Sequence, residues 1–269
     1  VYESENAYVE FKNLRHPIIE YLSDEKYIGN DLSLGIEESG IILYGINGVG
    51  KSSISKSIAT NIVLAQSGLF VCCDEMRFSP YNNIFTRINA NDNLFKNQST
   101  FVVEMMELKS ILKFCDNKTL MVGDEICKGT EENSALSILT AGIKRMVSKR
   151  ASFILATHFH QLYENKLLLE DCNVSFKHLQ VEFGESGIIY NRILMDGVGV
   201  NLYGIEVAKF ILDDKEFMNE CYEVRNILLN KSENVIVEPK KSNYNGKLYM
   251  TDCQICGSKE QLDTHHIKE

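Results

Sequence analysis

Apolar and polar positions follow one another along this chain in a pattern that predicts alternating strands and helices. Residues 39–44, SGIILY, form an apolar run of strand length, and residues 51–68 place apolar side chains at helical spacing. Two further apolar runs, 119–125 and 151–158, follow after helical stretches. This alternation predicts an α/β fold with a mostly parallel sheet flanked by helices.

The remaining segments carry weaker patterns. Residues 99–115 predict a helix capped by Ser99 or Thr100, with Val103, Met106, Ile111 and Phe114 on its apolar face. Further helices are predicted at residues 131–147 and at 202–230, the latter broken near 213–214, and further strands at 69–75, 173–183 and 187–195.

The loop between the first strand and its helix has the pattern Gly-x-x-x-x-Gly-Lys-Ser, from Gly45 to Ser52. In a strand–loop–helix context this pattern is typical of a phosphate-binding loop, and without that context it would be a chance glycine turn. Lys51 would reach the β and γ phosphates of ATP, and the Ser52 hydroxyl would bind Mg²⁺. The predicted nucleotide contacts are Gly45, Ile46, Asn47, Gly48, Val49, Gly50, Lys51, Ser52 and Ser53.

Three polar residues end the two later apolar runs. Asp124 is expected to join Ser52 around Mg²⁺, and Glu125 to polarise the attacking water as general base. His158 is expected to sense the γ phosphate as a third catalytic residue beside Lys51 and Glu125. The plainer alternatives are a solvent-facing strand end for the acids and a satisfied polar residue for the histidine.

Composition narrows the class of partner. The 269 residues carry a net charge of −9, and residues 231–269 contribute six lysines and six acids, so the whole excess lies in residues 1–230. An acidic domain binds duplex DNA weakly, so DNA contacts are expected from elsewhere in a larger molecule or from the C-terminal tail, residues 231–269. No apolar run approaches the roughly 20 residues of a membrane helix. The chain begins at Val1, and we interpret it as a fragment or a processed chain.

The eight cysteines divide into two groups. Six lie among apolar neighbours, which predicts buried free thiols in a reducing compartment: Cys72, Cys73, Cys115, Cys127, Cys172 and Cys221. Cys253 and Cys256 form a C-x-x-C near the C-terminus, which belongs to the tail discussed below.

Several motifs together resemble the MutS family of mismatch-repair ATPases. LRHPIIE, LYGINGVGKSS, QSTFVVEM, LMVGDEICKGT, ILATHFHQL and DGVGVNLYGIEVAK follow one another in that family's order, over residues 1 to about 230. The resemblance implies an ABC-type ATPase in which two subunits face each other with two nucleotides at their joint. It therefore implies a second MutS-type subunit, most simply a homodimer, and mismatched duplex DNA bound through upstream domains.

The resemblance also implies roles for individual residues. Ser99 and Thr100 would approach the γ phosphate of the opposite subunit, although Ser99 could also cap its own helix. Tyr27 would stack on adenine, with an ordinary core or surface tyrosine as the alternative. Residues 202–230 match helices that swap packing with the partner, or they form an ordinary covering helix.

The loop departs from the family's usual Gly-Pro-Asn-Met-Gly-Gly-Lys-Ser. Ile46 replaces proline, Gly48 replaces methionine, Val49 replaces glycine, and Lys128 stands where arginine is common. These changes affect the stiffness of the loop and the coupling segment, and so bear on the turnover rate, but they leave the residues that carry ATP binding and hydrolysis intact.

The tail, CQICGSKEQLDTHHI, resembles the opening of an HNH endonuclease module with a zinc clip. On that reading Cys253 and Cys256 are half of a zinc site, His265 holds the nuclease metal and His266 activates water. The module is incomplete, so these residues alone should not cut DNA, and a frayed polar tail is the alternative. A MutS ATPase joined to such a module resembles the branch known from octocoral mitochondria and giant viruses.

Taken together, the sequence predicts an ATP-hydrolysing dimeric motor domain that uses ATP and Mg²⁺, with Zn²⁺ in the tail. Its parts would be an ATPase domain (1–211), a helical dimerisation segment (212–230), a linker (231–247) and the start of a nuclease module (248–269). The family resemblance implies a mitochondrial location, with viral or cytoplasmic origin as alternatives. The rival functions are an ABC-type ATPase of a transporter or chromosome-maintenance protein, and a catalytically dead dimerisation module.

Overall fold

The structure is a computed structural model that describes residues 1–88, 100–127, 129–165, 169–184, 187–199, 204–212, 214–228, 240–241 and 249–250. Its contacts divide the chain into two compact units, Val1–Asn201 and Leu202–Glu269, which are described separately. The first unit contains the predicted glycine loop and the predicted acidic residues Asp124 and Glu125.

A six-stranded sheet forms the centre of the first unit, in the order β5-β6-β7-β3-β8-β9. Every neighbouring pair is parallel except β8–β9, which is an antiparallel hairpin. The α/β fold with a mostly parallel sheet is therefore confirmed. The strands are β3 (Gly40–Tyr44), β5 (Asn83–Arg87), β6 (Thr119–Asp124), β7 (Ser152–Ala156), β8 (Val174–Gly184) and β9 (Gly187–Asp196).

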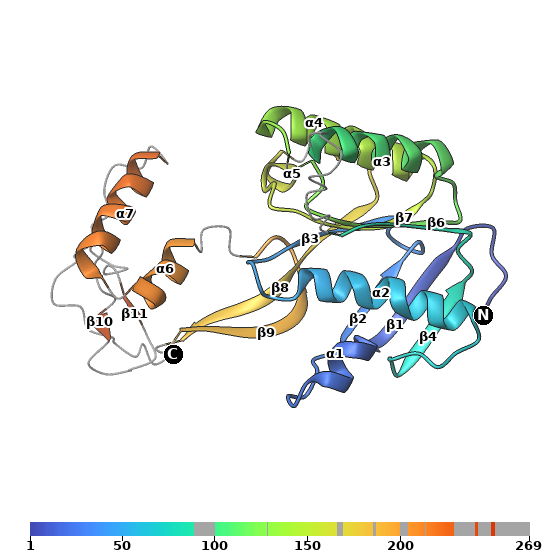
Figure 1. The fold of residues 1–269 in the computed structure, drawn as a ribbon, viewed down its shortest axis with the longest axis horizontal. Helices are drawn as coiled ribbons and strands as arrows, with labels where there is room; N and C mark the ends of the chain where they lie inside the picture. The colour runs from blue at the N-terminus through green and yellow to red at the C-terminus, as the bar shows by residue number, and fades with distance from the viewer. Residues whose placement is uncertain are drawn as a thin grey trace, which may run out of the picture. The chain divides into compact units, whose positions relative to one another are not determined.

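Helices cover both faces of this sheet (Figure 1). α2 (Lys51–Gln66) lies on one face, and α3 (Thr100–Phe114), α4 (Glu132–Ser148) and the short α5 (Gln161–Glu164) lie on the other. Every residue of β3, β6 and β7 is buried, as expected for parallel strands covered on both sides. α2 buries Ile54, Ile58 and Ile62, one residue every helical turn.

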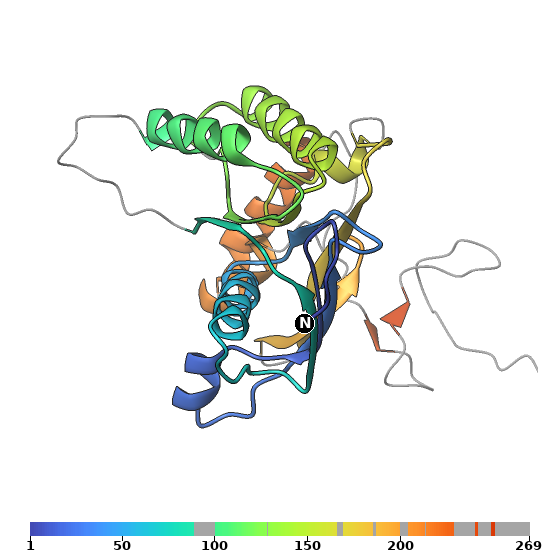
Figure 2. The same ribbon diagram turned by 90° about the vertical axis from the view of Figure 1, so that its right-hand side faces the viewer.

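A smaller antiparallel sheet lies beside α2, as the view in Figure 2 also shows. Its order is β2-β1-β4, with β1 (Tyr8–Leu14), β2 (Asn30–Leu34) and β4 (Glu75–Ser79), and the short helix α1 (Pro17–Leu22) connects β1 to β2. Buried Val9, Phe11, Leu34 and Phe78 lie in these strands. Burial alternates along β1, so the sheet keeps a polar second face.

One local prediction is wrong. The strand expected at residues 69–75 begins only at Glu75, and its apolar residues Leu69 and Phe70 are exposed in a loop. The helix predicted at residues 99–115 is confirmed as α3, where Ile111 of the apolar face is buried and Met106 and Phe114 are more than half exposed. A surface commonly exposes single apolar side chains, so hydrophobic character alone does not establish burial.

The described residues of the second unit form the helices α6 (Gly204–Leu212) and α7 (Lys215–Leu228) and the short strand pair β10 (Lys240–Lys241) and β11 (Tyr249–Met250). The predicted break is confirmed, because one helix ends at Leu212 and the next begins at Lys215. An ion pair of 3.0 Å joins Arg225 to Glu206 across the two helices. The domain boundaries at 211, 230 and 247 stay predictions. Among the described helices, none is both long and apolar enough to cross a membrane.

Candidate nucleotide-binding site

The glycine loop follows β3 and leads directly into α2, as the sequence predicts. Gly48 and Gly50 have φ of +80° and +114°, a backbone region that residues other than glycine rarely adopt. Gly50 is the N-cap of α2 and has no side chain to cap the helix. The N–H groups of the first helical turn can therefore bind an anion, assisted by the helix dipole.

Lys51 is the first residue of α2 and is buried, with 6% of its surface exposed. Its Nζ donates to the carbonyl oxygens of Gly45 at 2.6 Å and Ile46 at 3.3 Å. The ammonium group thus lies across the same loop whose glycines are shaped for an anion. This places a positive charge where the β and γ phosphates of a nucleotide are expected.

Ser52 and Asp124 meet although 72 residues separate them in the chain. Asp124 ends β6 and is buried, and the Ser52 hydroxyl donates to its Oδ2. A hydroxyl and a carboxylate are ligands that Mg²⁺ accepts, and Mg²⁺ commonly uses one or two such groups together with phosphate oxygens and water. No cluster of three or more His, Cys, Asp or Glu side chains that could hold a metal occurs in the described residues. The pair therefore fits a magnesium ion held jointly with phosphate, and not a preformed all-protein metal site.

Glu125 adopts an unusual backbone conformation. Its φ is +52°, in the left-handed region, and its N–H donates to the Ala156 carbonyl at the end of β7 at 2.9 Å. Its Oε1 lies 2.8 Å from Nε2 of His158, which follows β7. Strained backbone of this kind is frequent at functional sites, where the surrounding structure holds it in place. Here the conformation accompanies a direct contact between two predicted catalytic side chains.

A cavity of about 290 Å³ brings these residues together. Its lining consists of Ile46, Asn47, Gly48, Gly50, Lys51, Ser52, Ser53, Asp124 and Glu125. All nine belong to the predicted set. Val49 is fully buried and does not line the cavity, and Gly45 contributes the carbonyl that Lys51 binds. His158 reaches the site through its contact with Glu125.

Tyr27 lies in a different place. It is half-buried in the loop between α1 and β2 and lines a second cavity of about 660 Å³, together with Asn13, Arg15 and Asp74. The two cavities have no lining residue in common. Stacking of Tyr27 on adenine therefore stays a prediction.

Several predicted residues lie outside the described part of the chain: Ser99, Lys128, Cys253, Cys256, His265 and His266. Thr100 begins α3, but its side chain is not described. Their predicted roles in the opposite subunit's site, the zinc clip and the nuclease stay predictions.

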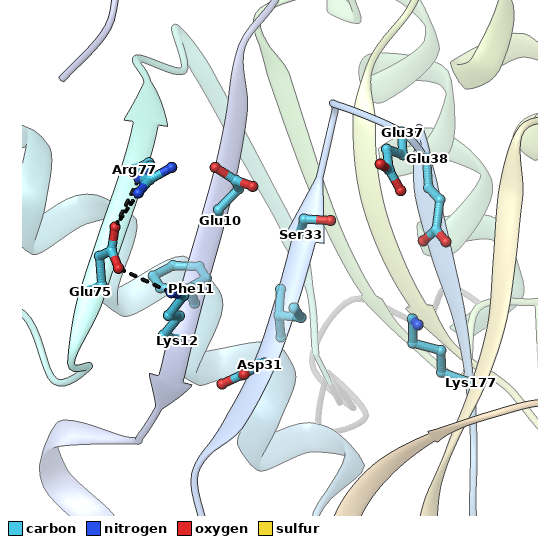
Figure 3. A pocket seen from close by; sticks show the side chains of 11 residues that line it. Glu10, Phe11, Lys12, Asp31, Ser33, Glu37, Glu38, Glu75, Arg77 and Lys177 are labelled. Carbon is cyan, nitrogen blue, oxygen red and sulfur yellow. Dashed lines mark hydrogen bonds and ion pairs between the residues drawn. The ribbon is translucent and has the colours of Figure 1, made fainter.

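A third cavity, of about 390 Å³, lies on the polar face of the small sheet (Figure 3). Five carboxylates line it, Glu10, Asp31, Glu37, Glu38 and Glu75, against three cationic side chains, Lys12, Arg77 and Lys177. Glu75 pairs with Lys12 at 3.3 Å and with Arg77 at 2.7 Å. The excess of negative charge disfavours a triphosphate in this acidic cavity, so it is a poorer nucleotide site than the cavity at the glycine loop.

The sequence analysis did not single out Tyr44, Asn61 and His160, which contact the elements that carry the site. All three are involved in contacts between segments far apart in the chain. Tyr44 ends an apolar run and Asn61 interrupts an amphipathic helix, so only the buried asparagine offered a signal: a polar residue on the apolar side of α2.

This combination of a central parallel strand, a phosphate-shaped loop and a helix opening on lysine is that of the P-loop α/β proteins. Within that class the chain belongs to the MutS family, because the sequence model of MutS domain V matches residues 41–228. The predicted family is thereby confirmed.

Similar proteins agree with this assignment. A mitochondrial DNA mismatch repair protein of Sarcophyton glaucum, a mutS homologue, is 39% identical over 97% of this chain and 26% of its own length. A mutS homologue of Acanthamoeba polyphaga mimivirus is 34% identical over 98% of the chain and 28% of its own length. The DNA mismatch repair protein MutS of Caldanaerobacter subterraneus is 38% identical over 74% of the chain. The chain thus spans about a quarter of the length of these relatives.

Proposed function

We propose that this chain binds and hydrolyses ATP as the motor domain of a DNA mismatch-repair protein. The observation that carries the proposal is the convergence of Lys51, Ser52, Asp124 and Glu125 on one cavity behind a glycine loop. The family membership supports the same function, since its members are mismatch-repair proteins.

Binding would use the loop and the start of α2. Backbone N–H groups of the loop would donate to phosphate oxygens, and the Lys51 ammonium would exchange the carbonyls of Gly45 and Ile46 for phosphate. Ser52 Oγ and Asp124 would hold Mg²⁺, which when bound neutralises charge on the phosphate oxygens. The fixed loop and the helix dipole then orient the phosphate chain.

Hydrolysis would use Glu125 as the general base. Its carboxylate takes a proton from water while the water oxygen bonds to the γ phosphorus, and the bond from that phosphorus to the β–γ bridging oxygen breaks. ADP and inorganic phosphate leave, and the proton passes on to solvent. His158, 2.8 Å from Oε1, holds the carboxylate in a fixed direction during this step.

The larger assembly is proposed from the family. A second MutS-type subunit, most simply another copy, would complete each site through Ser99 and Thr100. Mismatched duplex DNA would be bound by parts of a larger protein, because the net charge of −9 in this chain repels the phosphate backbone. The mitochondrial relative suggests a mitochondrial location, and the C-terminal residues suggest the start of a nuclease module.

The direct test compares Lys51→Ala with Lys56→Ala, a matched control on the same helix whose side chain is exposed. Loss of the Lys51 charge should lower ATP turnover about 100-fold or more, because one preorganised electrostatic contact is typically worth that much. Lys56→Ala should keep the turnover of the unmodified chain. Both rates would be measured by phosphate release with magnesium and ATP.

The rival function, a dimerisation module with a dead site, predicts no turnover in the unmodified chain. Turnover that survives Lys51→Ala would remove the glycine loop from the mechanism. Either result would overturn the proposal.

A further inference from the structure

Tyr44 is the last residue of β3 and directly precedes the glycine loop. Its side chain is fully buried, on the face of the sheet covered by α4 and α5, while the loop leads into α2 on the opposite face. Burial raises the pKa of the Tyr44 phenol, with a smaller contribution from Glu164. The hydroxyl therefore stays protonated and needs an acceptor, because a buried unpaired donor is costly.

That acceptor is the backbone carbonyl of Phe159, 3.1 Å from the Tyr44 hydroxyl. Phe159 is the residue directly after His158. The bond therefore connects the end of β3 with the turn after β7 that carries the imidazole contacting Glu125. The two bonded residues are 115 positions apart in the chain.

The same turn is held to Tyr44 by a ring contact. The His160 ring stacks on the Tyr44 ring, with centroids 4.9 Å apart and planes inclined by 28°. Burial lowers the pKa of His160, with Glu164 raising it and His158 lowering it. The stacked imidazole contacts the Tyr44 ring and so helps to hold the turn against the end of β3. Its Nδ1 is buried and has no hydrogen-bond partner among the described residues.

Further hydrogen bonds hold this turn together and connect it to β3. The Phe159 N–H donates to Thr157 Oγ1 at 3.1 Å, and the Thr157 N–H donates to the Leu43 carbonyl of β3 at 3.1 Å. The His160 N–H donates to the His158 carbonyl at 2.9 Å. His158 is therefore flanked on both sides by contacts to the end of β3.

We propose that Tyr44 is a positioning residue that sets the place of His158, and through it of Glu125, relative to the glycine loop. The expected effect on kcat rests on the proposed ATPase function. The placement of His158 by Tyr44 does not depend on activity. Tyr44 directly precedes Gly45, whose carbonyl binds Lys51 in the loop that would bind phosphate. Its side chain bonds to the turn that carries His158, which contacts Glu125, the residue that would activate water. The alternative is that Tyr44 only fills the core.

The experiment is Tyr44→Phe, which removes one oxygen atom and keeps the ring. Because misplacing a catalytic group by about 1 Å can cost up to about 100-fold in rate, we expect kcat to fall about tenfold. KM and the Kd of an ATP analogue should stay within about twofold, because uniform binding contacts remain in place. In the chain without nucleotide, the ring proton chemical shifts of His158, assigned with His158→Gln, should move.

Tyr81→Phe is a matched control. Tyr81 is 3% exposed, and its hydroxyl donates to Ser152 Oγ at the opposite end of the same strand β7, also at 3.1 Å. Removal of this hydroxyl should cost comparable stability and leave kcat and the His158 shifts unchanged. Equal losses of kcat in both variants, or unchanged His158 shifts in Tyr44→Phe, would overturn the proposal.

A second pair of variants serves if Tyr44→Phe fails to fold. His160→Ala removes the stacked ring and should lower kcat and move the His158 shifts, and His160→Phe restores a ring and should recover both. Absence of rescue would contradict the positioning role. If the unmodified chain hydrolyses no ATP, the proposed function fails, while the His158 shifts in the same variants still test the positioning inference.

Discussion

Asn61 shows how a single buried polar residue holds two substructures together. It is fully buried on α2, and its Nδ2 donates to the carbonyls of Arg15 at 3.0 Å and Ser57 at 2.8 Å. Its Oδ1 accepts the Cys72 N–H at 2.6 Å. The helix that begins at Lys51 is thereby fixed to the end of β1 and to the loop before β4. Position 61 therefore helps to hold the glycine loop's helix against the small sheet.

Asn61→Ala should lower the free energy of unfolding by about 2–4 kcal/mol, because it leaves the Arg15 carbonyl and the Cys72 N–H without their partner. Ser57→Ala is the control on the same helix. The Ser57 hydroxyl bonds only within α2, to the Ser53 carbonyl at 2.8 Å, and alanine favours helix, so about 1 kcal/mol or less is expected. Urea unfolding measures both. Equal costs for the two variants would contradict the linking role of Asn61.

Residues of the candidate site could be predicted because their chemistry is local. The spacing from Gly45 to Ser52 needs only its own strand and helix, and acids at a strand end point to one edge of the sheet. Contacts between distant segments that no motif marks could not be predicted. Nothing in the sequence around Tyr44 or Phe159 indicates that the phenol reaches that carbonyl, and Glu125 gives no sign of its left-handed backbone.

At the scale of elements, α1 is held by an uncommon cap. His16 is its N-cap, and the imidazole Nδ1 accepts the N–H groups of Ile18 at 3.2 Å and Ile19 at 3.3 Å. The residue is 7% exposed, and burial, followed by the charge of Lys56, lowers the pKa of His16 below its usual 6.5. Protonation at Nδ1 would remove the acceptor and end both bonds.

This cap predicts a pH dependence of stability. The unfolded chain binds the His16 proton more readily than the folded chain, so this contribution is fully present above the usual pKa and is lost as the pH falls below it. His16→Asn keeps a good N-cap that does not titrate in this range. The drop in unfolding free energy between pH 7.5 and pH 5.5 should be smaller in the variant, measured by urea unfolding at each pH. An unchanged drop would exclude His16 as a source.

Most elements of the large sheet and its covering helices were predictable from their patterns, including the weaker patterns of β8 and β9, whereas the strand expected at residues 69–75 begins only at Glu75. β3, β6 and β7 are fully buried runs, and α2 and α4 carry regular apolar faces, so pattern and fold agree. The loop before β4 has apolar residues that the fold leaves exposed, because its backbone bonds go to Asn61 and to β1 and not to a neighbouring strand of the large sheet. Tertiary contacts, and not the local apolar pattern, therefore determine the structure of the segment before β4.

At the scale of the whole molecule, the net negative charge contrasts with the local positive charge at the glycine loop. The negative charge of residues 1–230 and the acidic cavity of the small sheet are unsuited to phosphate, and the glycine loop with Lys51 is the place in the described structure where phosphate fits best. The chain spans about a quarter of the length of the mismatch-repair proteins it resembles.

The most direct measurement is a crystal structure of this chain with magnesium and an ATP analogue that resists hydrolysis. We predict that Lys51 Nζ leaves the carbonyls of Gly45 and Ile46 for phosphate oxygens, and that Ser52 and Asp124 would hold Mg²⁺. Glu125, still held by His158, should face the γ phosphate. A nucleotide bound elsewhere, with Lys51 still on its loop carbonyls, would contradict the proposed ATPase site.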